Sequence, residues 1–411
     1  MIMSKNINAP IWQPSQDQIK ASQISNFITA ANKRTGKTFE GYHDLWQWSV
    51  DDISGFWNLL WDEMNVIGHK GDTVFKEAAH MMDAKFFPDA RLNYAENMLK
   101  KRDDDLAIVF RGELSNTSQK KDIHYTYKEL YKQVSLWQNA MRHTGIKKGD
   151  RIAGYMPNIP ETIIAMLAAS SLGAIWASAS PDFGEQGVID RFSQIQPKIL
   201  ITVDGYFYNG KEIDCLEKIK AIQPALEGLE HTIIVPFLSE TPNISSLKNI
   251  HLSPDWIHNN EPDRDTATDA DIHFEAVEFD HPLFIMFSSG TTGTPKCITH
   301  SHGGVLLQHL KEHRLQSDIG EKDRVFYFTT CGWMMWNWLV SGIGSGATLM
   351  LYDGSPFYPD GNALWDYAQE YECTFFGTSA NILMPSNRRG YRQKIRMIYH
   401  HLELLHRRDH R

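Results

Sequence analysis

The sequence predicts an α/β protein in which two α/β subdomains, each with a mostly parallel sheet flanked by helices, follow a helical extension. Three observations support this. The chain has 411 residues, and a single hydrophobic core stops growing near about 250–300 residues, so more than one structural unit is expected. Hydrophobic residues make up 42% and charged residues 22% of the chain, as in globular domains. From residue 105 onward, short apolar runs alternate with helical patterns, which indicates βαβ units.

Composition excludes several classes of protein. The N-terminus lacks the basic stretch and apolar run of a signal peptide. The apolar stretch 163–179 is interrupted by Gly173 and diluted by serines, which favours a buried helix and strand over a membrane span. We therefore expect a cytoplasmic protein without a membrane partner. Four cysteines lie far apart and in no zinc-binding spacing, which indicates a reducing compartment and no metal site: Cys215, Cys297, Cys331 and Cys373.

The N-terminal part has two expected segments. Residues 1–37 are predicted to be a polar lead-in, and residues 38–99 a helical extension. Within the extension, apolar residues recur at steps of three and four, which predicts one amphipathic helix lying against a larger body: Trp46, Val50, Ile53, Trp57, Leu60, Trp61 and Met64. The block FFPDARLNYAENML, residues 86–99, then predicts a turn and a short helix.

Residues 100–235 are predicted to form the first α/β subdomain. Thr126 and Glu129 form a capping box, which predicts a helix from there to about residue 141. Further helices are expected at 160–172 and 185–195. Strands are expected at 106–110, 151–156, 174–179, 198–203 and 232–235. The polar residues 236–280 are predicted to be a connection.

Residues 281–380 are predicted to form a second, incomplete α/β subdomain. Its first strand, 283–287, leads into the motif that carries the functional prediction. A helix at 301–313 is expected to follow, with a further helix at 363–371. The remaining strands are expected at 324–328, 347–352 and 373–376.

The motif is SSGTTGTPK, residues 288–296. Its glycines allow the backbone to turn tightly and direct N–H groups at one point, while five hydroxyls and a lysine add donors and positive charge. It is neither a Walker A motif, because Thr294 and Pro295 separate Gly293 from Lys296, nor a GxGxxG motif. A surface loop without function is the alternative. The predicted polyphosphate-binding residues are Ser288, Ser289, Gly290, Thr291, Thr292, Gly293, Thr294 and Lys296.

This motif resembles the phosphate-binding signature of the adenylate-forming superfamily, which includes acyl-CoA synthetases, peptide adenylation domains and luciferases. Residues 86–99 resemble the N-terminal block of its acetyl-CoA synthetase branch. The segments 332–356 (GWMMWNWLVSGIGSGATLMLYDGSP) and 375–380 (FFGTSA) resemble acetoacetyl-CoA synthetases. The resemblance covers roughly residues 38–380.

The resemblance implies an AMP-forming ligase that uses Mg·ATP, acetoacetate and CoA. Acetoacetate would attack the α-phosphate of ATP, and the CoA thiol would then displace AMP. The loop would hold the β- and γ-phosphates, a matter of positioning and electrostatics. Two alternatives stay open: a ligase for another short-chain carboxylate, and a non-catalytic fragment that binds nucleotide.

The resemblance also implies two further sites. An acyl pocket would contain Trp333, Met335, Trp336 and Asn337, with Asn337 donating to the 3-oxo group; ordinary core packing is the alternative. Tyr208 and Lys211 fall where the branch has arginines that contact the CoA nucleotide, although an exposed loop lysine explains Lys211 equally well. His300 and His302 are interpreted as residues at a helix start rather than as catalysts.

After residue 380 the resemblance stops. Residues 381–411 carry eight Lys and Arg residues and two acidic ones, whereas the whole chain has a net charge of -9. The family's catalytic Lys lies in a C-terminal domain with no counterpart here, so no catalytic residue is assigned. We interpret the tail as out-of-frame translation and expect little or no ligase activity from this polypeptide alone. A basic tail for nucleic acid is disfavoured because the rest of the chain is acidic, and the oligomeric state is not predicted.

Overall fold

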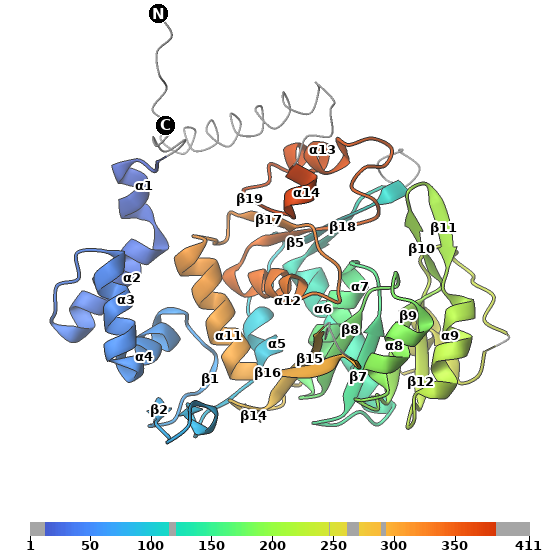
Figure 1. Ribbon diagram of the computed structural model, residues 1–411, viewed down its shortest axis with the longest axis horizontal. Helices are drawn as coiled ribbons and strands as arrows, with labels where there is room; N and C mark the ends of the chain where they lie inside the picture. Colours follow the sequence, from blue (N-terminus) through green and yellow to red (C-terminus); the bar gives the residue numbers. More distant parts are fainter. Residues whose placement is uncertain (1–12, 115–120, 246, 261–270, 289–292, 384–411) are drawn as a thin grey trace, which may run out of the picture.

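The fold contains two mostly parallel sheets with helices on their faces, as the sequence predicts (Figure 1). A computed structural model describes residues 13–114, 121–245, 247–260, 271–288 and 293–383. Four predicted loop residues, Ser289, Gly290, Thr291 and Thr292, lie outside the described residues, as do residues 384–411 of the predicted tail.

The larger sheet has seven strands in the order β13-β12-β9-β7-β8-β15-β16. All neighbours are parallel except β15 and β16, which are antiparallel. The bounds are β7 Arg151–Tyr155, β8 Ile175–Ala179, β9 Ile199–Val203, β12 His231–Val235, β13 Ile250–Leu252, β15 Pro282–Ser288 and β16 Lys296–Ser301.

The smaller sheet has five strands in the order β19-β17-β18-β5-β6, and only β6 runs antiparallel to its neighbour. The bounds are β5 Leu106–Gly112, β6 Ile123–Thr126, β17 Arg324–Tyr327, β18 Thr348–Asp353 and β19 Phe375–Gly377.

The two sheets do not follow the division of the chain at residues 236–280. Strand β5, expected in the first subdomain, pairs with β18 and with the unpredicted strand β6, while β15 and β16 complete the sheet of residues 151–252. The connection itself contains β13, the helix α10 (Ser253–Asn259) and β14 (Val277–Glu278). Periodicity identifies strands but does not say which strands pair, because pairing is decided by distant partners.

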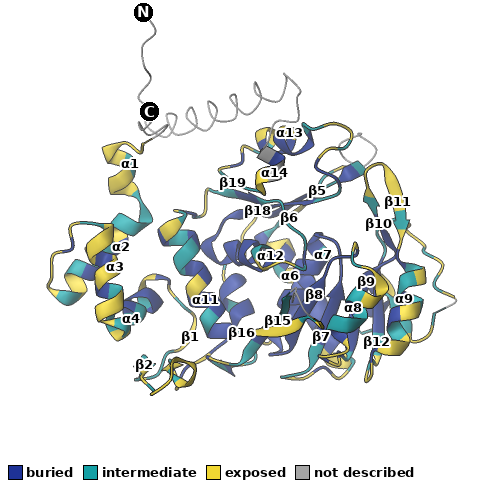
Figure 2. Ribbon diagram, in the orientation of Figure 1, coloured by how far each residue is buried: buried dark blue, intermediate teal, exposed yellow. Residues whose placement is uncertain are grey.

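The central core lies between the sheets. Alternate residues of a strand face opposite sides, so Ile108 of β5 and Ile152 of β7 enter this core, whereas Val109 and Ala153 pack on the outer faces. The helix α7 (Pro160–Ser171) is buried along its whole length (Figure 2). The predicted capping box of Thr126 and Glu129 is confirmed at the start of α6 (Tyr127–His143).

Further helices cover the outer faces. The larger sheet carries α8 (Glu185–Phe192) and α9 (Leu216–Ile222), and the smaller sheet carries α13 (Ala363–Glu370). Among the described residues, no helix has the length and apolar character needed to cross a bilayer.

The N-terminal helices differ from the prediction. The expected lead-in contains α1 (Gln16–Ala21) and α2 (Gln23–Thr35), and Phe27 of α2 joins the central core. The expected single helix is two helices, α3 (Tyr42–Asp51) and α4 (Ile53–Glu63), because Asp52 ends one and caps the next by accepting from Gly55 N–H at 2.8 Å. Trp46 and Val50, predicted on the packed face, are exposed. The short helix predicted in residues 86–99 is confirmed as α5 (Tyr94–Met98).

Candidate functional site

The predicted phosphate loop joins two strands of a hairpin. Strand β15 enters the loop and β16 leaves it, and the two ends of the motif, Ser288 and Lys296, pair across the hairpin. The helix predicted at 301–313 is confirmed as α11 (His302–Lys311), which the Ser301 hydroxyl caps by accepting from Gly304 N–H. The strand β16 between the loop and this helix was not predicted. A short polar strand between a loop and a helix has too few residues to show a clear period.

The described part of the loop is open to solvent. Gly293, Thr294 and Lys296 are exposed. Gly293 has φ +106°, and no atom of the described residues lies within 4 Å of the position that a Cβ would take. Glycine is required there by backbone conformation rather than by crowding. The lysine ammonium and the Thr294 hydroxyl are therefore accessible to an anion.

Gln194, which the sequence analysis missed, contacts the C-terminal end of the loop. Its Nε2 donates to the Pro295 carbonyl at 2.9 Å, and its Oε1 accepts from the Cys297 thiol at 3.7 Å. Gln194 follows α8, about one hundred residues earlier in the chain. No local signal in the sequence points to this contact, because it exists only once the two elements are packed together.

The four predicted acyl-pocket residues take different positions around α12 (Met334–Val340). Trp333 is 62% exposed and Met335 is half-buried. Trp336 is fully buried, and its Nε1 donates to Asn158 Oδ1 at 2.9 Å. Asn337 is buried, and its Nδ2 contacts the sulfur of Met286 at 3.7 Å.

Asn337 lines a narrow pocket of about 200 Å³, counted out to its mouth. Its Oδ1 is buried and has no hydrogen-bond partner within the described chain, and the same holds for Nε1 of Trp176, another pocket residue. Buried polar atoms in native proteins are nearly always paired, so unpaired ones in a pocket mark places where a ligand or water fits. The lining residues are Trp176, Ser178, Phe284, Ile285, Met286, Cys331, Gly332 and Asn337.

Strand β15 joins this pocket to the loop. Met286 lies in the pocket, and Ser288, two residues later, begins the motif. On the neighbouring parallel strand β8, the Ser178 hydroxyl donates to the Cys331 carbonyl at 2.7 Å, which fixes the wall next to α12. The pocket and the loop thus meet near the carboxyl ends of parallel strands, where α/β proteins commonly bind ligands.

Tyr208 and Lys211 form a cross-strand pair in a separate hairpin of β10 (Gly205–Tyr208) and β11 (Lys211–Asp214). Tyr208 is 49% exposed, and Lys211 is also exposed. The sequence Asn209-Gly210 between them is a strong hairpin signal, although the sequence analysis did not use it.

The histidines after the loop have structural roles. His302 is the first residue of α11, and its Nδ1 accepts from Tyr94 N–H at 3.2 Å. Burial, followed by the charges of His281 and Lys148, lowers the pKa of His302 to about 3, so the ring is neutral near pH 7. His300 lies in β16 against Phe284, with 5.1 Å between ring centroids.

Asp353 is a titratable group that the sequence analysis missed. It ends β18 and accepts from Asn158 N–H at 3.2 Å. Burial raises its pKa to about 7, and the carboxylates of Glu113 and Asp182 add to the increase. The signal was available, because a carboxylate directly after a buried parallel strand is commonly part of a site.

Comparison with known proteins gives the class to which this α/β fold, with its loop at the end of β15, belongs. The chain belongs to the AMP-binding enzyme family, whose model matches residues 95–392. A second family model, the acetyl-coenzyme A synthetase N-terminus, matches residues 42–98. Together the two models match residues 42–392, which is twelve residues beyond residue 380, where the sequence analysis expects the resemblance to stop.

Within this family the chain is similar to acetoacetyl-CoA synthetases, as the sequence predicts. It is 46% identical over 383 residues to the acetoacetyl-coenzyme A synthetase of Rhizobium meliloti (strain 1021), a match of 93% of this chain and 57% of the relative. For the acetoacetyl-CoA synthetase of Gallus gallus the identity is 42%, over 91% of this chain and 55% of the relative. The chain thus spans about half the length of the curated relatives it matches.

Two other relatives extend the comparison. The solved acetoacetyl-CoA synthetase from Streptomyces lividans superposes with a TM-score of 0.83 at 39% identity, covering 92% of this chain and 56% of that one. A malonamoyl-CoA synthetase of Penicillium aethiopicum is 38% identical over 93% of this chain and 54% of the relative.

Proposed function

We propose that this chain belongs to an acetoacetate–CoA ligase. Such an enzyme converts ATP, acetoacetate and CoA into AMP, diphosphate and acetoacetyl-CoA through an acyl-adenylate. Strand β15 lines the Asn337 pocket and leads into the SSGTTGTPK motif. This placement, in a chain similar to acetoacetyl-CoA synthetases, is the observation that supports the proposal. A cytoplasmic location is part of the proposal, and the four free thiols support it.

In this proposal the loop binds the triphosphate. The predicted residues Ser288, Gly293, Thr294 and Lys296 would offer donors to its β- and γ-phosphates and help align the α-phosphate for attack by the acid. Mg²⁺ that accompanies ATP would be held mainly by phosphate oxygens and water.

The acid would enter the pocket next to Asn337. The mostly apolar residues around the pocket suit a short acyl chain, and the buried Asn337 amide supplies one polar contact. In the proposal the Asn337 amide is oriented with Nδ2 toward the pocket, where Nδ2 donates to the 3-oxo oxygen. The malonamoyl-CoA synthetase among the relatives makes another 3-carbonyl acid the second candidate substrate.

Replacing Lys296 with alanine tests the phosphate site. We expect Lys296→Ala to weaken ATP binding about 10- to 150-fold, because a charge-assisted contact contributes about 1.5–3 kcal/mol. Isothermal calorimetry on the 411-residue chain measures the change, with the exposed Lys37→Ala as the matched control. Equal ATP affinity in Lys296→Ala and the unmodified chain would contradict the phosphate site.

Replacing Asn337 with leucine tests the acyl pocket. Leucine has a similar shape, and among the described residues the side-chain amide of Asn337 has one partner, the Met286 sulfur at 3.7 Å, so the fold should tolerate the substitution. Butyrate lacks the 3-oxo group. We therefore expect the ratio of acetoacetate affinity to butyrate affinity to fall about tenfold or more in Asn337→Leu. Binding of acetoacetate, malonamate and butyrate, each with ATP present, gives the ratios. An unchanged ratio of acetoacetate to butyrate affinity would mean that the acid does not bind next to Asn337.

A further inference from the structure

We propose that Glu113 is a positioning residue for CoA: its buried carboxylate fixes the β10–β11 turn and so sets the place of Tyr208 and Lys211. The inference rests on the proposed function, because it takes CoA as the ligand of this hairpin. Glu113 lies directly after β5, about one hundred residues away from the hairpin in the sequence.

The turn itself is tight. Tyr208 pairs with Lys211, which leaves a two-residue loop of Asn209 and Gly210. Both have positive φ, +54° and +76°, the conformation of a type I′ turn that matches the twist of the strands. Because the two flanking residues are opposite each other, any displacement of the turn displaces the Tyr208 ring and the Lys211 ammonium together.

The Glu113 carboxylate accepts three backbone N–H groups from two separate segments. Asn209 N–H donates to Oε2 at 2.8 Å and Gly210 N–H donates to Oε1 at 2.6 Å, while Ser355 N–H donates to Oε2 at 2.7 Å. The Glu113 residue is 1% exposed. A carboxylate that is buried and accepts three N–H groups is strongly bound, because charge-assisted bonds are about twice as strong as neutral ones.

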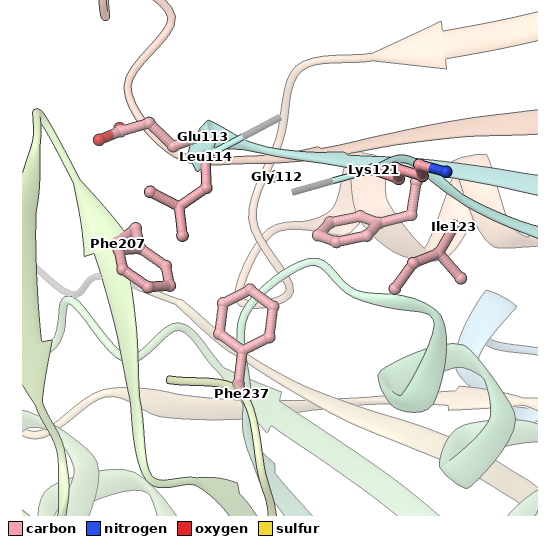
Figure 3. A pocket seen from close by; sticks show the side chains of 8 residues that line it. Gly112, Glu113, Leu114, Lys121, Ile123, Phe207 and Phe237 are labelled. Atoms are coloured by element: carbon pink, nitrogen blue, oxygen red, sulfur yellow. The ribbon is translucent and has the colours of Figure 1, made fainter. Parts of the chain in front are cut away.

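The direction of the side chain agrees with this role. In Figure 3 the Glu113 carboxylate points away from Phe207 and Phe237, which line a pocket beside it, and toward the tip of the light-green hairpin. Glu113 therefore contributes its charge to the turn rather than to that aromatic pocket.

Close packing leaves the turn little freedom. A Cβ on Gly210 would lie 2.7 Å from the ring of Tyr358, and a Cβ on Gly354 would lie 2.6 Å from Cβ of Glu113. Both glycines have positive φ, +76° and +130°. The turn is thus held between Glu113 on one side and Tyr358 on the other, with no space for a larger residue.

The tip of the hairpin depends on this anchor. Within the described part of the chain, β10 and β11 pair with each other and with no further strand. Tyr206 and Ile213 pack against the central core at the base of the hairpin, so the Glu113 contacts are needed mainly to fix its exposed tip. A lysine on a mobile hairpin loses entropy when it binds an anion, whereas a lysine on a fixed turn loses less. The phosphates of CoA suit the Lys211 ammonium, and its adenine suits the exposed ring of Tyr208.

The test compares CoA and ATP binding by calorimetry in the 411-residue chain and four variants. We expect Lys211→Ala and Glu113→Gln each to weaken CoA binding about five- to tenfold and leave ATP binding unchanged. In the double variant the loss should be clearly smaller than the product of the two single losses, because Glu113 acts in part through Lys211 and in part through Tyr208. Glu212→Gln, an exposed neighbour on the same hairpin, is the matched control and should change neither affinity.

The hydrogen-exchange rates of the turn amides measure the contacts with Glu113 directly. The glutamine side chain in Glu113→Gln has one accepting oxygen in place of two. The backbone amides of Asn209 and Gly210 should therefore exchange faster. If Glu113→Gln does not fold, Gly210→Ala displaces the turn from the other side through Tyr358 and should give the same loss of CoA affinity with the carboxylate intact.

Three results would overturn the inference, and they differ from one another. Faster exchange at Asn209 and Gly210 with unchanged CoA affinity would make Glu113 purely structural and leave the proposed function intact. Additive losses in the double variant would mean that Glu113 does not act through Lys211. ATP binding without any CoA binding by the unmodified chain would remove CoA from this hairpin, and with it the CoA half of the proposed function.

Discussion

Arg111→Met is expected to lower the free energy of unfolding by about 3–5 kcal/mol, because it leaves a buried carboxylate without its cation. Nε of Arg111 donates to both oxygens of Asp122, at 3.0 and 3.1 Å, and both side chains are about one-tenth exposed. Arg111 also pairs with Glu370 of α13 at 2.7 Å and lies over the ring of Tyr367 at 4.7 Å. The cluster joins β5 and β6 to α13, so its loss should loosen the whole helix.

Guanidinium unfolding of the variant measures this effect. The matched control is Arg324→Met, which removes a pair with Glu372 at 3.1 Å whose side chains are 38% and 46% exposed. An exposed pair contributes about 0–1 kcal/mol, so this control should differ little from the unmodified chain. If the two variants lost the same stability, burial would not be the reason that Arg111 matters.

Acidification from pH 7 to pH 5 is expected to destabilise the fold through three buried histidines on α11 and the turn after it. Burial is the largest cause that lowers the pKa of His302 and His309 to about 3 and of His313 to about 4. An unfolded histidine has a pKa near 6.5. Their contribution is therefore complete above pH 6.5 and is lost as the pH falls from 6.5 toward 4, since only the unfolded chain takes up protons.

The size of this effect follows from the pKa difference. At pH 5 each histidine would cost about 2 kcal/mol and the three together about 6 kcal/mol, if they act independently. Denaturant unfolding between pH 7.5 and pH 4.5 measures the slope of the free energy of unfolding against pH.

One substitution separates titration from packing. His313 stacks on Trp338 at 4.1 Å and its Nδ1 bonds the His309 carbonyl, so His313→Gln should lower stability at every pH. Its slope should nevertheless fall by about 1.4 kcal/mol per pH unit, the value for one proton. The exposed His43→Gln should leave the slope as it is, and an unaltered slope in His313→Gln would contradict the prediction.

Local signals in the sequence predicted most elements well. The capping box at Thr126, the apolar run after Pro160 and the strand before Ser288 all have the predicted type and nearly the predicted bounds, because each depends on neighbours within a few residues. The SSGTTGTPK motif was recognisable for the same reason. The helix α1 was missed even though Ser15 and Gln18 form a capping box, since its polar residues gave no apolar period.

Contacts between distant segments could not be predicted in this way. Trp46 and Val50 fit the apolar period of the N-terminal helices, but the break at Asp52 turns α3 so that Leu45 and Trp48 are buried instead. Asn337 was predicted in the acyl pocket by resemblance, whereas its neighbour Met286 was found only from the packing of α12 against β15. Gln194 and Glu113 likewise act on segments about one hundred residues away.

The sequence by itself determined the fold class, the order of most helices and strands, the phosphate-loop motif and the family, because these depend on local pattern and on short stretches of chain. The tertiary structure decided which strands share a sheet, that the loop closes a hairpin, which side chains surround Asn337, and that a carboxylate after β5 holds the Tyr208–Lys211 turn. These features arise from the packing of distant segments, and a linear pattern of residues does not specify which of them meet.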